Sequence, residues 1–384
     1  MVQLLSPEGV LCTNGSAAEY LPYIDALSDD ALRTFYRDMV VTRRFDVEAA
    51  NLQRQGQLGL WVPSMGQEAA QIGSAHAARS QDHLFPAYRE HAVGMVRGVD
   101  VLGIIKLLRG TTHGGWDPSA TGNFHLYTLV VGSQSLHATG YAMGVVFDEH
   151  TATGNPDVDE AVMVYFGDGA TSQGDVSEAF VFAASFQTPQ VFFLQNNQWA
   201  ISVPVSVQSR TPLYLRSCGF GVPGVQIDGN DVLASYAVTA KNLDAARSGG
   251  GPRMIEALTY RIGAHTSSDD PTKYREDSQL QYWLARDPIA RYETWLRSRG
   301  EGDRFFSDVR TEAEDFAADI RRRTLELPSP ERDTIFDFVY SEPHPVIDEQ
   351  KHWLAEYEAS FTSTGLSTST SAGLGTGPAA GGAA

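Results

Sequence analysis

The strongest constraint on the fold is a set of short, continuously apolar runs separated by segments of helical character. Ala161–Phe166 reads AVMVYF, and Gln190–Leu194 is a second such run. Phe124–Val131 and Met254–Ile262 are further strand candidates. Strands that are apolar on both faces occur where helices cover both sides of a parallel sheet. The sequence therefore predicts an α/β fold, a doubly wound parallel sheet with helices on both faces, over roughly residues 50–265.

Helical patterns extend the predicted fold at both ends. Ser28 is suited to cap a helix that ends near Gly56, and Asp29 and Asp30 in its first turn complement the helix dipole. Residues 277–327 are charged and periodic, which predicts further helices. We divide the chain into an N-terminal arm with the helix start, a main domain, a C-terminal extension and a disordered low-complexity tail, at residues 1–45, 46–330, 331–361 and 362–384.

The charge of the 384-residue chain restricts its partners. Lys plus Arg is 29 and Asp plus Glu is 47, which gives a formal net charge of −18. This balance argues against a nucleic acid as the main partner, because phosphate binding needs a basic surface. No run of about 18 apolar residues is present, so no membrane span is expected. Cys12 and Cys218 form no CxxC pair and no signal peptide pattern is present, so we expect a cytoplasmic protein.

Polar residues follow two of the predicted strands directly. Gly167, Asp168 and Gly169 come after AVMVYF, and Asn196 and Asn197 come after the next strand. A right-handed crossover places both ends at the carboxyl edge of the sheet, where ligands bind. Carboxylate and amide oxygens suit Mg²⁺, and glycines let a phosphate approach the backbone. The pattern predicts a metal-bridged diphosphate site, with a strand-ending turn and an unrelated polar segment as the simpler alternative.

Two other patterns predict structure rather than ligand binding. Gly219–Gly224 matches GxGxxG, but it contains Pro223 and precedes a predicted strand, VQI, whereas dinucleotide binding needs a helix there. Asp228–Asp231 (DGND) is best explained as a tight turn that caps the following helix.

The GDG and NN motifs resemble the thiamine diphosphate fingerprint, and the wider sequence resembles the alpha subunit of the E1 component of 2-oxo acid dehydrogenase complexes. The resemblance runs from about residue 30 to 345. It rests on MGQE at 65–68, YRE at 88–90, NNQWAIS at 196–202, DGNDV at 228–232 and YRIGAHTSSDDPTKYR at 260–275.

The resemblance implies thiamine diphosphate and Mg²⁺ as cofactors. The implied metal ligands are Asp168, Asn197 and the backbone carbonyl of Trp199. Tyr88 and Arg89 would contact the diphosphate, and Ser133 and its neighbours would line the aminopyrimidine. The backbone at Gly167, Gly169 and Ala170 would approach the diphosphate.

His265 is the residue to which the resemblance gives a catalytic role. It follows a predicted strand and opens a polar loop, and by position alone it would be a solvated loop histidine. The resemblance makes it a cofactor-contacting residue that exchanges a proton during acyl transfer. The network implied to order its loop is Arg261, Asp269, Asp270, Tyr274 and Arg275.

Several positions depart from the family pattern, among them Ser177 and Val181, which replace the His and Asn often seen after GDG in relatives. Gln195 stands where some relatives carry an Arg near the diphosphate, which would weaken that contact by one charge. His137 and Ala138 stand where some relatives hold a structural monovalent cation, so that second ion site is in doubt.

The resemblance also implies partners and a substrate. Thiamine chemistry needs a carboxylate at the aminopyrimidine, which comes from a second domain, and this chain resembles the diphosphate-binding domain alone. An E1 beta chain would supply it in a heterotetramer of two alpha and two beta chains, and a lipoylated E2 acyltransferase would accept the acyl group. Branched-chain 2-oxo acids are favoured as substrates. Pyruvate, acetoin-type chemistry and a non-catalytic thiamine-domain scaffold are the alternatives.

Overall fold

The computed structural model describes residues 1–112 and 114–363. Of the predicted tail 362–384, only the backbone of its first two residues is described, within helix α14 (Pro345–Ser363). The rest of that tail lies outside the described residues.

A five-stranded parallel sheet forms the centre of the fold, as the sequence predicts. Its order is β1-β2-β3-β7-β6, and every neighbouring pair is parallel. The bounds are β1 His83–Phe85, β2 Val162–Gly167, β3 Gln190–Asn196, β6 Gly224–Asp228 and β7 Arg253–Leu258. A separate two-stranded antiparallel hairpin, β4 Trp199–Ala200 with β5 Val203–Pro204, follows β3 directly.

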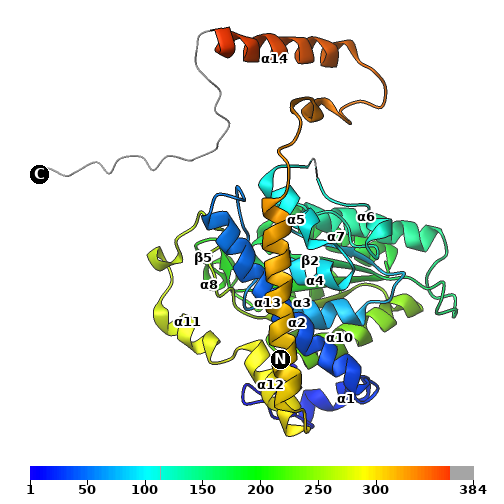
Figure 1. Cartoon of the computed structure of the whole chain (residues 1–384). Helices are drawn as coiled ribbons and strands as arrows, with labels where there is room; N and C mark the ends of the chain where they lie inside the picture. Colours follow the sequence, from blue (N-terminus) through cyan, green and yellow to red (C-terminus); the bar gives the residue numbers. More distant parts are fainter. Residues whose placement is uncertain (113, 364–384) are drawn as a thin grey trace, which may run out of the picture.

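The central strands are apolar because both of their faces are buried. Met163 and Tyr165 of β2 belong to the larger hydrophobic cluster, while Val162, Val164 and Phe166 belong to the cluster on the other face. This division follows from the two-residue side-chain period of a strand. The sheet is therefore covered on both sides, which confirms the predicted doubly wound architecture (Figure 1).

Different helices cover the two faces. The larger cluster is completed by α2 Asp29–Arg54, α3 Glu68–Ala77, α4 His91–Val96, α5 Val101–Arg109, α10 Val232–Ala245, α12 Pro288–Ser298 and α13 Asp303–Leu325. The smaller one is completed by α6 Ser133–Phe147 and α7 Gly174–Phe186. The remaining short helices are η1 Gly15–Tyr20, α1 Leu21–Asp25, η2 Pro118–Ala120, η3 Asp168–Ser172, α8 Val205–Gln208, α9 Tyr214–Cys218, η4 Ala246–Gly250, η5 Pro271–Lys273, α11 Asp277–Leu284 and η6 Arg332–Phe336.

Both predicted helix caps are confirmed. The Ser28 side chain accepts from the Ala31 amide at the start of α2. Asp231 caps α10 by accepting from Leu233 and Ala234, and it also accepts from the amide of Leu4 in the N-terminal arm. The N-terminal arm contains η1 and α1, and Val2 pairs with Ile227 of β6.

The predicted strand Phe124–Val131 is wrong. Only Phe124 forms a bridge, to Leu84 of β1, and the following segment forms no strand, although the Thr128 amide donates to the Ala87 carbonyl at 2.8 Å. Leu129 and Val130 are 65% and 70% exposed. An apolar run predicts a buried strand, but these side chains face outward because β1 is only three residues long and ends before them.

The C-terminal extension lies apart from the body. Figure 1 shows α14 separated from the sheet and its helices, connected through η6 and the segment after α13.

His91 gives the fold a stability that depends on pH. It is fully buried, with Nε2 2.8 Å from the Val62 carbonyl, Nδ1 2.7 Å from the Tyr127 hydroxyl, and its ring stacked on Trp61. Burial, with the nearby charge of Arg89, lowers the His91 pKa to about 4. Between about pH 6.5 and 4 the unfolded chain therefore binds a proton that the native chain does not, so stability falls as the pH falls.

We expect acidification from pH 7 to 4.5 to cost the wild type about 2–3 kcal/mol more than His91→Gln in urea unfolding. His91→Gln itself should be less stable at pH 7, because the stacked ring is lost. His150→Gln, which changes an exposed histidine, is the matched control and should follow the wild type. An equal acid-induced loss in wild type and His91→Gln would show that His91 is not the group responsible.

Candidate active site

A cavity of about 230 Å³ opens at the carboxyl ends of β2 and β3. Gly167 ends β2 and Asp168 begins η3, while Asn196 ends β3 and Asn197 follows it. The two motifs thus meet at one edge of the sheet, as predicted. The lining also includes Tyr88, Arg89, Gly169, Ala170, Trp199, Arg261 and His265 from the predicted set. Ser133 is not among the lining residues; its hydroxyl donates to the Val130 carbonyl, and its neighbours Gly132 and Gln134 line the cavity instead.

Three oxygen atoms converge beside Asp168. The Nδ2 atom of Asn197 donates to Gln67 Oε1 at 2.8 Å. In this orientation Asn197 Oδ1 lies 3.3 Å from Asp168 Oδ1 and 3.2 Å from the Trp199 carbonyl oxygen. Reversing the amide would let it donate to both oxygens, but would turn its own oxygen toward the acceptor of Gln67.

This cluster has the spacing of ligands around a small cation. Adjacent ligands of an octahedral Mg²⁺ lie roughly 3 Å apart, because each oxygen is about 2.1 Å from the ion. The described residues contain no group of three or more His, Cys, Asp or Glu that could hold a metal. The spacing of 3.2 and 3.3 Å between the Asn197 Oδ1 atom and the other two oxygens is compatible with ligands of such an ion.

Asp168 is held in place from the other side. Its Oδ2 accepts from Gln208 Nε2 at 2.8 Å, which leaves Oδ1 toward Asn197. Burial raises the pKa of this carboxyl group, although the Gln208 hydrogen bond acts in the opposite direction. A buried carboxylate without a cation is costly, so the position favours a bound positive charge.

The backbone beside Asp168 is tightly constrained. A Cβ added at Gly169 would lie 2.9 Å from the Ala200 Cβ, so the β4 hairpin approaches this turn as closely as glycine permits. Ile201, in the same hairpin, lines the cavity with φ at +55°, an uncommon conformation for a β-branched residue. It was missed by the sequence analysis, because no local pattern marks a strained isoleucine.

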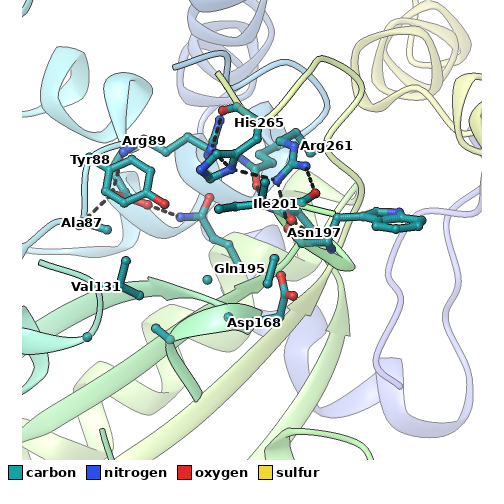
Figure 2. Close-up of a pocket in the computed structure, with 18 of the residues that line it drawn as sticks. Ala87, Tyr88, Arg89, Val131, Asp168, Gln195, Asn197, Ile201, Arg261 and His265 are labelled. Atoms are coloured by element: carbon teal, nitrogen blue, oxygen red, sulfur yellow. Dashed lines mark hydrogen bonds between the residues drawn. The ribbon is translucent and has the colours of Figure 1, made fainter. Parts of the chain in front are cut away.

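Two arginines meet at His265. Arg89 Nη2 and Arg261 Nη1 each lie 3.3 Å from His265 Nδ1, and Figure 2 shows their side chains approaching the imidazole from different directions. A guanidinium has only donors, so Nδ1 accepts and the proton of the neutral ring is on Nε2. Burial, followed by the charges of Arg89 and Arg261, lowers the His265 pKa to about 4.

The loop that carries His265 is ordered largely as predicted. The His265 amide donates to Asp269 Oδ2 at 2.8 Å, and the Tyr274 hydroxyl donates to the same carboxylate. Arg275 donates to the carbonyls of Arg261 and Gly263. Asp270 does not join this network; it accepts from Thr272 in the following turn.

Tyr88 and Arg89 line the cavity, and the Arg89 guanidinium is hydrogen-bonded to backbone groups of the wall. The Arg89 guanidinium donates to the Pro63 carbonyl and to the His265 carbonyl, the latter at 3.0 Å. It also lies 5.6 Å from the Tyr88 ring centroid, a cation–π distance. An anion in the cavity would compete for this guanidinium.

Gln134 adds an acceptor without a partner. Its Nε2 donates to the Tyr165 carbonyl at 2.9 Å, while its buried Oε1 has no hydrogen-bond partner among the described residues. A buried acceptor in a cavity wall favours a ligand that carries N–H groups.

A family profile described as "Dehydrogenase E1 component" matches residues 36–308. The chain belongs to this family. It is 44% identical over 355 residues to the 3-methyl-2-oxobutanoate dehydrogenase subunit alpha of Mycobacterium tuberculosis, covering 92% of this chain and 93% of that protein. It is 37% identical to the pyruvate dehydrogenase E1 component subunit alpha of Acholeplasma laidlawii, covering 84% and 92%. For the corresponding Staphylococcus epidermidis protein the identity is 32%, covering 94% of each chain.

Among residues 1–112 and 114–363, no helix is both long and apolar enough to cross a membrane.

Proposed function

We propose that this chain is the alpha subunit of an E1 component that oxidatively decarboxylates branched-chain 2-oxo acids and passes the acyl group to the lipoyl group of an E2 acyltransferase. The observation that carries the proposal is the convergence of Asp168, Asn197 and the Trp199 carbonyl at the sheet edge. Thiamine diphosphate, when bound, supplies the electron sink that decarboxylation needs.

The chain's own residues would hold this cofactor. Asp168, Asn197 and the Trp199 carbonyl would bind Mg²⁺. The backbone at Gly167, Gly169 and Ala170 would face the diphosphate, and Arg89 would turn from His265 to contact it together with Tyr88. The acceptor of Gln134, beside Ser133, would receive an N–H of the aminopyrimidine.

His265 would act in the acyl-transfer half. When Arg89 turns to a diphosphate, one guanidinium leaves Nδ1 and negative charge arrives. Both changes raise the His265 pKa from about 4 toward the ordinary range of histidine. The ring then becomes able to exchange a proton near neutral pH.

The proposed substrate class rests on the comparisons. The higher identity is to a relative named for 3-methyl-2-oxobutanoate, a branched-chain acid, and the lower identities are to relatives named for pyruvate. Pyruvate is therefore the second candidate.

An exposed apolar surface on α6 and α7 supports the proposal that a partner chain binds there. Tyr141 and Phe147 of α6 and Val181, Phe182 and Phe186 of α7 are between 37% and 65% exposed. A Cβ added at Gly140 or Gly144 of α6 would meet nothing within 4 Å, so another chain has room to approach closely. We propose that an E1 beta chain covers this surface in a cytoplasmic heterotetramer of two alpha and two beta chains, and completes the cavity.

The test is to co-purify the chain with its beta partner and to measure dye reduction on 2-oxoisovalerate, 2-oxo-4-methylvalerate and pyruvate, each with and without thiamine diphosphate and Mg²⁺. Cofactor-dependent turnover of the branched acids supports the proposal. Turnover of pyruvate alone would retain the cofactor chemistry and replace the substrate class. Bound cofactor without any turnover would favour the non-catalytic scaffold.

A further inference from the structure

Asp46 is a buried carboxylate of α2 that holds the segment of residues 61–65. The residue is 3% exposed. Oδ1 accepts from the indole Nε1 of Trp61 at 2.8 Å and from the Ser64 amide at 3.1 Å, and Oδ2 accepts from the Met65 amide at 3.0 Å. The segment forms neither a helix nor a strand of its own. Its course therefore depends on this side chain, and hydrogen bonds to a carboxylate are stronger than those between neutral groups.

This segment in turn carries the loop that presents His265. The Trp61 amide donates to Ser267 Oγ at 3.0 Å, and the Ser267 amide donates back to the Trp61 carbonyl at 2.9 Å. On the other side of the histidine, the Ile262 amide donates to the Met65 carbonyl at 3.0 Å. These bonds lie before and after His265 in sequence, so the position of the segment sets the position of the imidazole.

Close packing does little to fix this loop from behind. His265 itself lines the active-site cavity, whereas its neighbours Ala264 and Thr266 line a second cavity of about 320 Å³. Asp46 lines this second cavity rather than the active site. A loop that borders two cavities has few atoms packed against it, so its position depends mainly on hydrogen bonds.

Arg89 makes a further connection between the segment and the loop, and the proposed function removes it. The Arg89 guanidinium donates to the Pro63 carbonyl of the segment and to the His265 carbonyl of the loop, the latter at 3.0 Å. When Arg89 turns to the diphosphate, both carbonyls lose this donor. The bonds of Trp61 and Met65 then have to hold the loop at the stage when His265 acts.

We propose that Asp46 is a positioning residue that keeps His265 in place when Arg89 leaves the loop for the diphosphate. This inference rests on the proposed function and adds to it a residue that touches neither substrate nor cofactor. In the free protein Asp46 and Arg89 both support the loop, so the loss of Asp46 should matter most in the loaded enzyme. A displacement of about 1 Å at a reacting group can lower a rate about a hundredfold.

An isosteric variant and a matched control are available on the same helix. Burial raises the Asp46 pKa to about 6, although its three hydrogen bonds act in the opposite direction, so the group is an anion at pH 8. Asn has the shape of Asp but only one acceptor oxygen, so the NH₂ group of Asp46→Asn faces one of the three donors. Glu48→Gln is the control, because Glu48 is also a buried carboxylate of α2 but pairs with Arg44 and Arg321 instead.

The first measurement is hydrogen exchange at pH 8 in the intact alpha–beta complex, with and without thiamine diphosphate and Mg²⁺. The amides of Ile262 and Ser267 should exchange faster in Asp46→Asn than in the wild type, by roughly tenfold in the loaded complex and by less in the free one. Glu48→Gln should exchange as the wild type does at these amides. Wild-type exchange in Asp46→Asn, or a larger increase in the free complex than in the loaded one, would overturn the proposal.

The second measurement is acyl transfer to a lipoyl acceptor at the same pH. We expect Asp46→Asn to lower this rate by about 10–100-fold and to change the dissociation constant of thiamine diphosphate by no more than about threefold. Glu48→Gln should retain transfer at a comparable loss of melting temperature, which separates positioning from general stability. An equal loss of transfer in the two variants, or a loss confined to cofactor affinity, would contradict the role of Asp46.

Ser267→Ala changes the other end of the same chain of bonds, and it keeps the proposal testable if Asp46→Asn does not fold. It should lower transfer by about tenfold, and the double variant should lose little more than Asp46→Asn alone, because both changes interrupt one connection. Wild-type transfer in Ser267→Ala, or losses that multiply in the double variant, would show that Asp46 does not act through this segment. A wild-type complex that binds no thiamine diphosphate would instead contradict the proposed function, while exchange in the free complex would still show whether Asp46 holds the loop.

Discussion

Replacing Asp168 by Ala should abolish Mg²⁺-dependent binding of thiamine diphosphate and lower 2-oxo acid turnover by roughly a thousandfold or more. Asp168 supplies the only formal negative charge among the three converging oxygens, and Asn197 and the Trp199 carbonyl are neutral. Loss of a charged metal ligand costs several kcal/mol, and about 1.4 kcal/mol corresponds to a factor of ten.

The fold should tolerate this change. The Asp168 side chain accepts one hydrogen bond, from Gln208, whose Nε2 also lies 3.3 Å from the Val203 carbonyl. No side-chain donor is therefore left buried without a partner. We expect the melting temperature without cofactor to stay close to that of the wild type, and the increase on adding thiamine diphosphate and Mg²⁺ to disappear.

The measurements are cofactor titration of the alpha–beta complex with and without Mg²⁺, thermal unfolding, and dye reduction. Asp157→Ala, which removes an exposed aspartate from a loop, is the matched control and should behave as the wild type. If Asp168→Ala bound thiamine diphosphate with wild-type affinity and still required Mg²⁺, Asp168 would not be a metal ligand.

The parts of the site that follow strands could be predicted, because chain order and strand direction fix them. Asp168 and Asn197 each follow a buried strand with an apolar core, VMVYF in β2 and VFFL in β3, and parallel strands bring such ends to one edge. The surroundings of Glu90 could not be predicted in this way. A glutamate beside an arginine suggests an ion pair, yet the Arg89 side chain reaches His265, 176 residues away in sequence. The Gln208 contact with Asp168 likewise depends on how the β4 hairpin folds back, which no local pattern records.

The segment after Phe124 illustrates a second limit. Apolar residues predict burial, and the fold places Leu129 and Val130 on the surface next to the cavity mouth. In a subunit of a larger assembly, an apolar run serves equally as an interface. The apolar pattern alone does not distinguish a buried strand from an exposed interface segment. The strand prediction therefore failed at the edge of the sheet, where only a partner chain could bury these side chains.

Replacing His265 should separate acyl transfer from cofactor binding. Asn places an oxygen near the position of Nδ1, so His265→Asn retains an acceptor for Arg89 and Arg261 but removes the ring that exchanges a proton. We expect transfer to a lipoyl acceptor to fall by about 10²–10⁴-fold. The dissociation constant of thiamine diphosphate should change by no more than about threefold, because Arg89 is still free to turn to the diphosphate.

The pH profile supplies the decisive readout. Without cofactor, burial and then the charges of two guanidiniums hold the His265 pKa at about 4, so the ring of the free enzyme is neutral at pH 5 and above. With cofactor bound, the pKa should rise, and the acyl-transfer rate of the loaded wild type should show a titration closer to pH 6–7 that His265→Asn lacks. An unchanged pH profile in His265→Asn, or a loss confined to cofactor affinity, would make His265 a positioning residue for Arg89 rather than the group that moves the proton.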